Sequence, residues 1–577
     1  MCAVCVRRRA RKDITVCPHC NEAAKARVRE SRKRKAELAR QRHALVLNEA
    51  AADAAAGQYA YPAALRYYDR ALACTALGRA DDIRVSQKIA RAYFFSHAPE
   101  CAGAWLERAL TALRTTGLPG DTAVEAASLL LRMSRQHWLN AQTIAALPAI
   151  GEAIQLGTAA KDRAISSRAN LAMAHYLILL GRHEAAQPFF EAAGGVLQSA
   201  DAETRAVSLT QHAILQAARG NKEAAYAGFE SAVDVAKSLA DGYWVTATWD
   251  DFAIWAMALG DSRTSQLCRQ RALFVARDHH ISWRIAYLSL RYANLLIELE
   301  EYEHARELAL DALTYGVAAP CIVILVATVG LKLEATGGTS LRHRIDYSQA
   351  LEYAFASGEP GRIGPMASAM IRSHLAKGAP REARTLLRRA LSALLSADHA
   401  WDLLFDAAAI GNEAEQRRAR ALLGERAALP NGDVASAYLN LFDARLSQRR
   451  GGVERQRRFG SIAASSFARL GWRGQERLAR SYAGADGKAK SHASETPAPV
   501  VFRTLLGDAS KLTAREEEVA RLVLRGLTNR AIARELAISE HTVESHMTSI
   551  MNRLGIRSRH QLGDTLSVGV SRVTGER

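Results

Sequence analysis

A turn-and-helix pattern recurs along most of this chain and constrains its fold more than any other feature. An apolar helix end, a short turn and a new amphipathic helix come together repeatedly. These turns lie near Gly181, Gly220, Gly260, Glu300 and Gly378, at successive separations of 39, 40, 40 and 78 residues. Such a period is typical of stacked helix pairs, because one pair can bury its apolar face only against its neighbours. The sequence therefore predicts an all-α chain built mainly as a helical array.

The same period extends in both directions from these five turns. It predicts further turns at Gly57, near Ala98, at Asn140, near Gly337 and Gly338, at Gly411 and at Gly451. Together they give about ten helix pairs over residues 57–482. The pattern resembles tetratricopeptide repeats stretched beyond their usual ~34 residues. The resemblance implies an extended solenoid whose concave surface binds an unknown protein or small-molecule effector.

No residue of the array marks the effector site in the sequence. Tryptophans are concentrated in the middle of the array, at Trp244, Trp249, Trp255 and Trp283. Aromatic residues at helical spacing are more often core residues than parts of a ligand site. We therefore expect these tryptophans to be buried.

Residues 512–562 contain the signals of three short helices. The capping and stop residues are, in chain order, Thr513 with Glu516, Gly526, Thr528, Ser539 and Gly555. Thr513 and Glu516 can satisfy each other's backbone donors as a capping box. The second helix would run to about Leu536 and the third to about Leu554. Only a few residues separate these two helices, which predicts a helix-turn-helix.

The third of these helices has two distinct faces. Its apolar stripe consists of Val543, Met547, Ile550 and Leu554, which we expect to pack on Val519, Leu522, Val523, Ile532 and Leu536. The opposite face carries His541, Glu544, Ser545, Thr548 and Asn552, which can hydrogen-bond base edges in a major groove. Residues near the helix starts, Thr528, Asn529, Arg530, Thr542 and His546, are candidates for phosphate contacts. Double-stranded DNA is therefore the predicted partner.

The motifs LTAREEEVA, GLTNRAIA, ISEHTVESH and RLGIRSR resemble the LuxR-type, or GerE-like, DNA-binding domain. The resemblance covers about the last seventy residues and includes a fourth helix from about Arg557, which implies a homodimer. Two departures stand out. Glu544 replaces a lysine that is usual in the family, and Ala531 replaces a glutamate, which puts the family's preferred DNA sequence in doubt. The alternative is a scaffold or adaptor whose small terminal domain binds protein.

Two CxxC pairs stand near the N-terminus, Cys2 with Cys5 and Cys17 with Cys20. A short hairpin could bring these four thiolates onto one structural zinc ion, a small metal-binding knuckle. Two disulfides, or an unstructured tail, are the alternatives. Residues 1–43 contain 14 Lys and Arg but only 4 Asp and Glu. The net positive charge of this segment is therefore more than half of the chain's formal charge of +18. Such a basic arm is either a solvated helix or disordered, and it could add salt-sensitive affinity for nucleic acid.

The sequence predicts five segments: a knuckle at 1–22, a basic arm at 23–56, the array at 57–482, a linker at 483–505 and the helix-turn-helix domain at 506–577. The other cysteines, Cys74, Cys101, Cys268 and Cys321, are expected in the core. The longest apolar run, residues 316–331, is too short to cross a bilayer and is expected to be a buried helix. No secretory signal, phosphate-binding loop or catalytic motif is recognised, so we expect a cytoplasmic protein that is not an enzyme.

Overall fold

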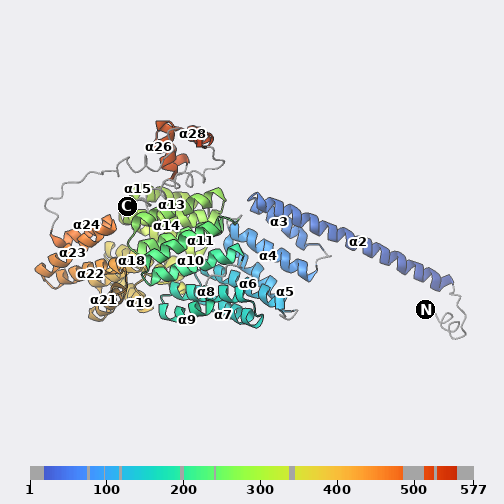
Figure 1. Ribbon diagram of the computed structural model, residues 1–577, viewed down its shortest axis with the longest axis horizontal. Coiled ribbons are helices and arrows are strands. Elements are labelled where there is room, and N and C mark those ends of the chain that lie inside the picture. The colour runs from blue at the N-terminus through green and yellow to red at the C-terminus, as the bar shows by residue number, and fades with distance from the viewer. Residues whose placement is uncertain are drawn as a thin grey trace. The chain divides into compact units, whose positions relative to one another are not determined.

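The computed structural model (Figure 1) describes residues 18–74, 78–96, 98–115, 120–194, 201–239, 242–316, 318–336, 345–484, 512–524 and 529–554. Every regular element within these ranges is helical. The chain divides into two compact units: residues 1–96 with 101–117, and residues 97–100 with 118–577. The predicted all-α fold class is thus confirmed for the described part of the chain.

The first unit contains two helix pairs. Its helices are α2 (Pro18–Gly57), α3 (Tyr61–Leu72), α4 (Arg79–Phe95) and α5 (Ala102–Arg114). The short 3-10 turn η1 (Pro99–Cys101) precedes α5, and its first two residues are assigned to the second unit. Residues 21–40 of α2 are all exposed, as expected of a solvated basic helix. The later part of α2 buries Leu45 and Ala52 against Tyr68 of α3 and Ile89 of α4.

The second unit contains the rest of the array. Its helices are α6 (Gly120–Leu139), α7 (Thr143–Ala159), α8 (Arg163–Leu179), α9 (His183–Ala193), α10 (Ala202–Ala218), α11 (Lys222–Ala236), α12 (Tyr243–Ala258), α13 (Ser262–Asp278), α14 (Ser282–Glu298), α15 (Tyr302–Thr314), α16 (Pro320–Ala335), α17 (Tyr347–Ser357), α18 (Pro360–Ala376), α19 (Pro380–Ala393), α20 (Trp401–Ile410), α21 (Glu413–Ala427), α22 (Asp433–Arg449), α23 (Val453–Leu470) and α24 (Arg473–Ala483). Consecutive helices contact each other in pairs along the chain (Figure 1). The predicted helical array is confirmed.

Left-handed residues set the repeat. Ala141, Gly181, Gly220, Gly260 and Glu300 all have φ between 55° and 83°, and each follows the first helix of a pair. At Gly220 the turn is closed by two backbone bonds, Gly220 N to Ala217 O at 2.9 Å and Asn221 N to Gln216 O at 2.8 Å. This is the usual way in which a left-handed residue ends a helix and satisfies its last carbonyls. The described turns at the extrapolated positions also lie where a first helix ends, whereas Gly337 and Gly338 lie outside the described residues.

Contacts between neighbouring pairs keep the same register. Thr210 and Thr248 share a hydrogen bond of 2.9 Å between their hydroxyls, and they are 38 residues apart. Ser368 donates to Asp406 at 2.5 Å across the same interval. These contacts place the first helices of successive pairs side by side, α10 against α12 and α18 against α20.

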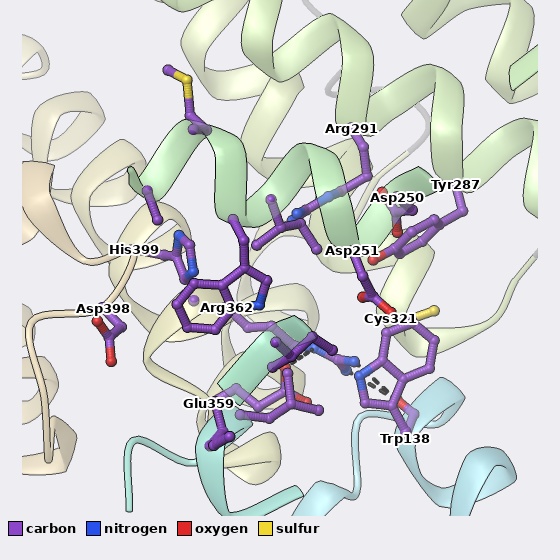
Figure 2. A pocket seen from close by; sticks show the side chains of 18 of the residues that line it. Trp138, Asp250, Asp251, Tyr287, Arg291, Cys321, Glu359, Arg362, Asp398 and His399 are labelled. Carbon is purple, nitrogen blue, oxygen red and sulfur yellow. Dashed lines mark hydrogen bonds and ion pairs between the residues drawn. The ribbon is translucent and has the colours of Figure 1, made fainter. Parts of the chain in front are cut away.

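A second set of contacts joins residues that are 208 to 224 positions apart. The Arg362 guanidinium donates to the carbonyl oxygen of Trp138 at 3.1 Å (Figure 2). Ser262 donates to Leu470 O at 3.1 Å, and the Asn431 amide donates to Gly220 O. These intervals span between five and six repeats. The array of the second unit thus completes one superhelical turn, and the next turn closes against the first.

Single-residue expectations for the array are largely met. Cys74, Cys268 and Cys321 are buried, but Cys101 is exposed, so the core prediction is wrong for Cys101. Cys101 belongs to η1, at the exposed entry to α5, and not to a packed helix face. The apolar run forms the buried helix α16, with Pro320 at its first position, where a missing N–H costs nothing. Among the described helices none has the length and apolarity to span a bilayer. Of the tryptophans in the middle, only Trp244 is not fully buried.

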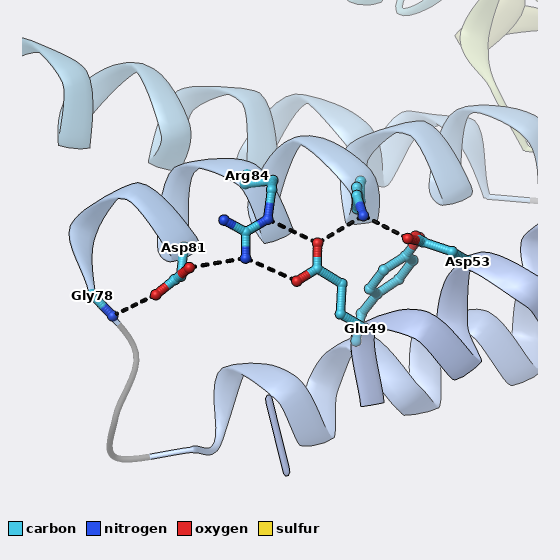
Figure 3. Close-up of polar contacts among 7 residues, drawn as sticks. Glu49, Asp53, Gly78, Asp81 and Arg84 are labelled. Atoms are coloured by element: carbon cyan, nitrogen blue, oxygen red, sulfur yellow. Dashed lines mark hydrogen bonds and ion pairs between the residues drawn. The ribbon is translucent and has the colours of Figure 1, made fainter. Parts of the chain in front are cut away.

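Carboxylates and cations link α2 to α4 within the first unit (Figure 3). Glu49 accepts two bonds of 2.8 Å from Arg84 and contacts Lys88 Nζ at 2.7 Å. Lys88 also reaches Asp53 at 2.6 Å, and Arg84 reaches Asp81 at 2.9 Å. The hydrogen bond from Arg84, together with Lys88, outweighs burial and lowers the pKa of Glu49 to about 2. Glu49 is therefore charged at all ordinary pH values and fixes α2 against α4.

Candidate nucleic-acid interface and central cavity

Three helices near the C-terminus form a small domain: α26 (Ala514–Leu524), α27 (Asn529–Glu535) and α28 (Glu540–Leu554). The capping box before α26 is formed as predicted. Thr513 N donates to Glu516 Oε2 at 2.7 Å, and Glu516 N donates to Thr513 Oγ1 at 3.3 Å. Ser539 caps α28 by accepting from Thr542 N at 3.0 Å. The turn between α27 and α28 is closed by Ile538 N donating to Ala533 O at 2.9 Å.

The predicted apolar stripe of α28 faces the inside of this domain. Val543, Met547 and Ile550 are buried together with Val519, Leu522, Val523 and Ile532, and Leu536 packs at the edge. The side chain of Leu554 lies outside the described residues. This burial fixes the rotation of α28, so the face opposite the stripe must be the outer one.

Glu516 holds α28 against α26. Its side chain is buried and accepts from Ser549 Oγ at 2.5 Å, while Arg553 Nε lies 3.2 Å away. Burial raises the pKa of Glu516, but hydrogen bonds from Ser549 and Thr513 act against it and bring the net pKa below its usual value. The sequence predicted the capping role of Glu516 but not its contacts with α28.

The polar residues predicted for the outer face of α28 are all exposed: His541, Glu544, Ser545, Thr548 and Asn552. Ser545 and Thr548 donate at 3.0 Å to carbonyls one turn earlier in their own helix, so their hydroxyl oxygens are still able to accept. His541 Nδ1 lies 3.7 Å from the Glu544 carboxylate. The outer face therefore offers acceptors and one ionisable ring, all reachable from solvent.

The flanking residues are only partly described. Asn529, Thr542 and His546 are half-buried, whereas Thr528, the side chain of Arg530 and the predicted fourth helix near Arg557 lie outside the described residues. Arg534 of α27 is exposed, although the sequence analysis did not single it out. Its position in the last turn of a short helix carried no motif that could have identified it.

Inside the array lies a cavity of about 350 Å³ that no sequence pattern indicated. Its walls come from both superhelical turns, with α6, α8, α12 and α14 from the first and α18 and α20 from the second. Side chains of α6, α12, α14 and α18 point into one common space (Figure 2). The lining includes several arginines, carboxylates and aromatic rings, among them Arg291, Asp251 and Trp138.

The family model of bacterial regulatory proteins, luxR family, matches residues 510–565, which contain α26, α27 and α28. The spore germination protein GerE of Bacillus subtilis (strain 168) is 46% identical over 50 residues, which are 9% of this chain and 68% of GerE. The chain belongs to the luxR family of bacterial regulatory proteins.

Other relatives also match over short stretches of the chain. The two-component response regulator PprB of Pseudomonas aeruginosa is 40% identical over 83 residues, 13% of this chain and 29% of PprB. The putative HTH-type transcriptional regulator Rv0890c of Mycobacterium tuberculosis is 47% identical over 53 residues, 9% of this chain but only 6% of that protein. Among solved structures, the crystal structure of yeast Tom70 aligns over 80% of this chain and 98% of that chain, with 11% identity and a TM-score of 0.29.

Proposed function

We propose that this protein is a transcription regulator that binds double-stranded DNA with the outer face of α28. The observation that carries the proposal is the division of α28 into a buried apolar stripe and an exposed polar face. A helix fixed in this way can enter a major groove and present its polar side chains to base edges. The luxR-family match over residues 510–565 supports the same conclusion.

Within this proposal the exposed residues differ in their roles. Glu544 is an acceptor near the start of α28, so it would take a hydrogen from the amino group of a cytosine. Ser545 and Thr548 would accept or donate at neighbouring bases. Thr528, Asn529, Arg530, Thr542 and His546 would bind phosphates, which position the helix without reading the sequence.

The experiment compares two substitutions in the full chain. Glu544→Ala should change the preferred sequence in a selection from random DNA. Arg530→Ala should weaken binding to all sequences and reduce the slope of log K against log salt by about one unit. Arg417→Ala is the charge-matched control, because Arg417 is exposed on α21 and, among the residues that the structure describes, pairs with Glu413 alone, at 3.2 Å.

The outcomes separate this function from its alternative. If the selected sequence is bound no more tightly than random DNA, the regulator proposal fails and the scaffold reading takes its place. If Glu544→Ala and Arg530→Ala reduce binding equally on every sequence, the assignment of faces on α28 is wrong. An effect of Arg417→Ala as large as that of Arg530→Ala would show that net charge alone decides binding.

The proposal extends to the remaining parts of the chain. The segment from about Arg557 would form the contact of a homodimer, so the target would be an inverted repeat with half-sites about one helical turn apart. The helical array would sense the effector. Cys2, Cys5, Cys17 and Cys20 would hold one structural zinc ion, a proposal that rests on their spacing.

A further inference from the structure

We infer that the central cavity of the array binds a small organic anion with an aromatic or otherwise apolar body. The inference names the chemical class of the effector, and it rests on the proposed function only in treating that ligand as an effector. Most of the charged groups that line the cavity pair with one another, and a few do not.

Most of the charged side chains around the cavity are paired within the array. Lys332 Nζ lies 2.7 Å from Glu298 and 3.8 Å from Asp402. Arg362 Nε lies 3.0 Å from Glu359. Because these groups neutralise one another, they leave no charge for a ligand to compensate.

Arg291 of α14 is different. Among the described residues it forms no hydrogen bond and no ion pair, and its Nε is buried without a partner. Elsewhere in the array, cations pair with carboxylates 34 or 35 positions away, as Lys332 does with Glu298. For Arg291 the residues 34 positions before and after are Met257 and Leu325, and both line the cavity. The repeat thus supplies no carboxylate to Arg291 at this interval, and its charge lies beside the cavity.

Two further arginines add to this positive charge. Arg284 is only 3% exposed, and its Nη2 is buried without a hydrogen-bond partner. Its Nη1 lies 3.9 Å from Asp250, which is already bonded to Arg269. Arg135 of α6 stacks on the ring of Trp244 at 4.9 Å and forms no ion pair within the described residues, although its charge acts on the carboxylate of Glu203. A buried guanidinium with an unused donor favours an anionic partner.

The unpaired carboxyl group in the cavity compensates this charge only in part. Asp251 forms no hydrogen bond or ion pair within the described chain, and burial raises its pKa to about 7, against the pull of Arg284 and Arg291. The two cavity histidines, His175 and His399, are neutral at pH 7 because burial lowers the pKa of each to about 4. The net charge available to a ligand is therefore positive.

Aromatic rings form the remaining walls. Trp138 meets Tyr287 edge to face with ring centroids 5.8 Å apart (Figure 2). Trp255 meets His399 with ring centroids 5.9 Å apart. Such surfaces favour a flat or apolar body. The volume of about 350 Å³ lies within the range of about 300–1,000 Å³ that is usual for small-molecule sites. Closure by the second superhelical turn excludes a folded macromolecule.

The test uses two fluorescent probes with the same aromatic body and the full chain. 8-Anilinonaphthalene-1-sulfonate is an anion, and N-phenyl-1-naphthylamine is its neutral counterpart. The wild-type protein should bind the anion at least roughly tenfold more tightly, because a charge-assisted bond to a partly buried guanidinium is worth about that factor. Arg291→Gln should remove most of this preference while changing the affinity for the neutral probe less than about twofold.

Two more variants keep the test decisive. Arg135→Gln should also reduce the preference for the anionic probe. It replaces Arg291→Gln in the test if circular dichroism shows that Arg291→Gln is unfolded. Arg417→Gln, on the exposed face of α21, should change neither affinity. The inference is wrong if the wild-type protein binds both probes with equal affinity, or if neither probe binds at roughly 1 mM. It is also wrong if the preference for the anion remains in both Arg291→Gln and Arg135→Gln.

The same samples separate this inference from the proposed function. DNA binding measured in parallel depends on α28 and not on Arg291. Selective anion binding without sequence-preferring DNA binding leaves the cavity site standing and removes the regulator function. Sequence-preferring DNA binding with no preference for the anionic probe supports the regulator function and removes the cavity site.

Discussion

Gly220→Ala tests the closure of the second superhelical turn against the first. Gly220 has φ of 81°, and its carbonyl accepts a hydrogen bond from Asn431, which is 211 residues further along the chain. A Cβ at position 220 would fall on the carbonyl group of Pro430, well inside van der Waals contact. Either the two turns must separate locally or the turn at 220 must change its backbone.

The loss of folding free energy in Gly220→Ala has separable contributions. A left-handed backbone costs an alanine about 1–2 kcal/mol, offset by about 0.4–1 kcal/mol because alanine restricts the unfolded chain. Gly378 provides the control, because its φ is 71° and a Cβ there meets nothing within 4 Å. Gly378→Ala should thus cost about 1 kcal/mol. Gly220→Ala adds the clash and the weakened bond to Asn431, so it should cost about 2–4 kcal/mol more.

Hydrogen exchange followed by mass spectrometry locates the effect. Gly220→Ala should speed exchange at both partners of the closure, residues 215–225 and 426–436, although they are far apart in sequence. Gly378→Ala should affect only the neighbourhood of its own turn. The contact between superhelical turns would be refuted if the two variants destabilised the protein equally. It would also be refuted if exchange became faster at residues 215–225 but did not change at residues 426–436.

Three further predictions concern the other parts of the chain. Glu49→Gln should remove about 1–2 kcal/mol, after allowance for the partly exposed cations on α4; because Glu49 has a lowered pKa of about 2, wild-type stability should fall between pH 4.5 and 2 in acid titration and the variant should lack that step. Glu516→Gln should cost about 1–3 kcal/mol and speed exchange in α26 and α28, whereas Glu517→Gln, whose side chain has no bond in the described residues, should not. Elemental analysis should find about one zinc per chain, lost on replacing Cys17 and Cys20 with serine; oxidised cysteines without metal would contradict this.

Local signals explain how much of the fold could be predicted. Glycines with φ near 70–85° stand at the turns at 181, 220 and 260, so the pattern of helix end, turn and helix was visible in the sequence. Ala141 and Glu300 adopt the same backbone without being glycine, and only the period located their turns. On α28 the 3.6-residue spacing of Val543, Met547 and Ile550 fixed which face is outside.

The contacts between superhelical turns had no such signal. Nothing in the sequence near His183 indicates Asp398, yet the two are bonded, and Arg426 lies 3.2 Å from the same carboxylate. Their meeting depends on the summed rotation of five or six repeats, which small changes in each helix pair can shift. The cavity depends on the same summed rotation, because its walls come from both superhelical turns. The sequence could therefore predict an inner surface for the effector but not the residues that form the site.

Closure and ligand binding should consequently be coupled, and Gly220→Ala can show it. The cavity walls include Trp138 and Arg291 from the first turn and Arg362 and His399 from the second. A ligand shifts the array toward the closed arrangement only by binding it more tightly than the open one, which is what an anion among buried and partly buried arginines would do. Gly220→Ala should thus weaken binding of 8-anilinonaphthalene-1-sulfonate, whereas Gly378→Ala should not. Since neither glycine lines the cavity, unchanged affinity in Gly220→Ala would mean that the cavity forms without the closure, and the proposed coupling would be wrong.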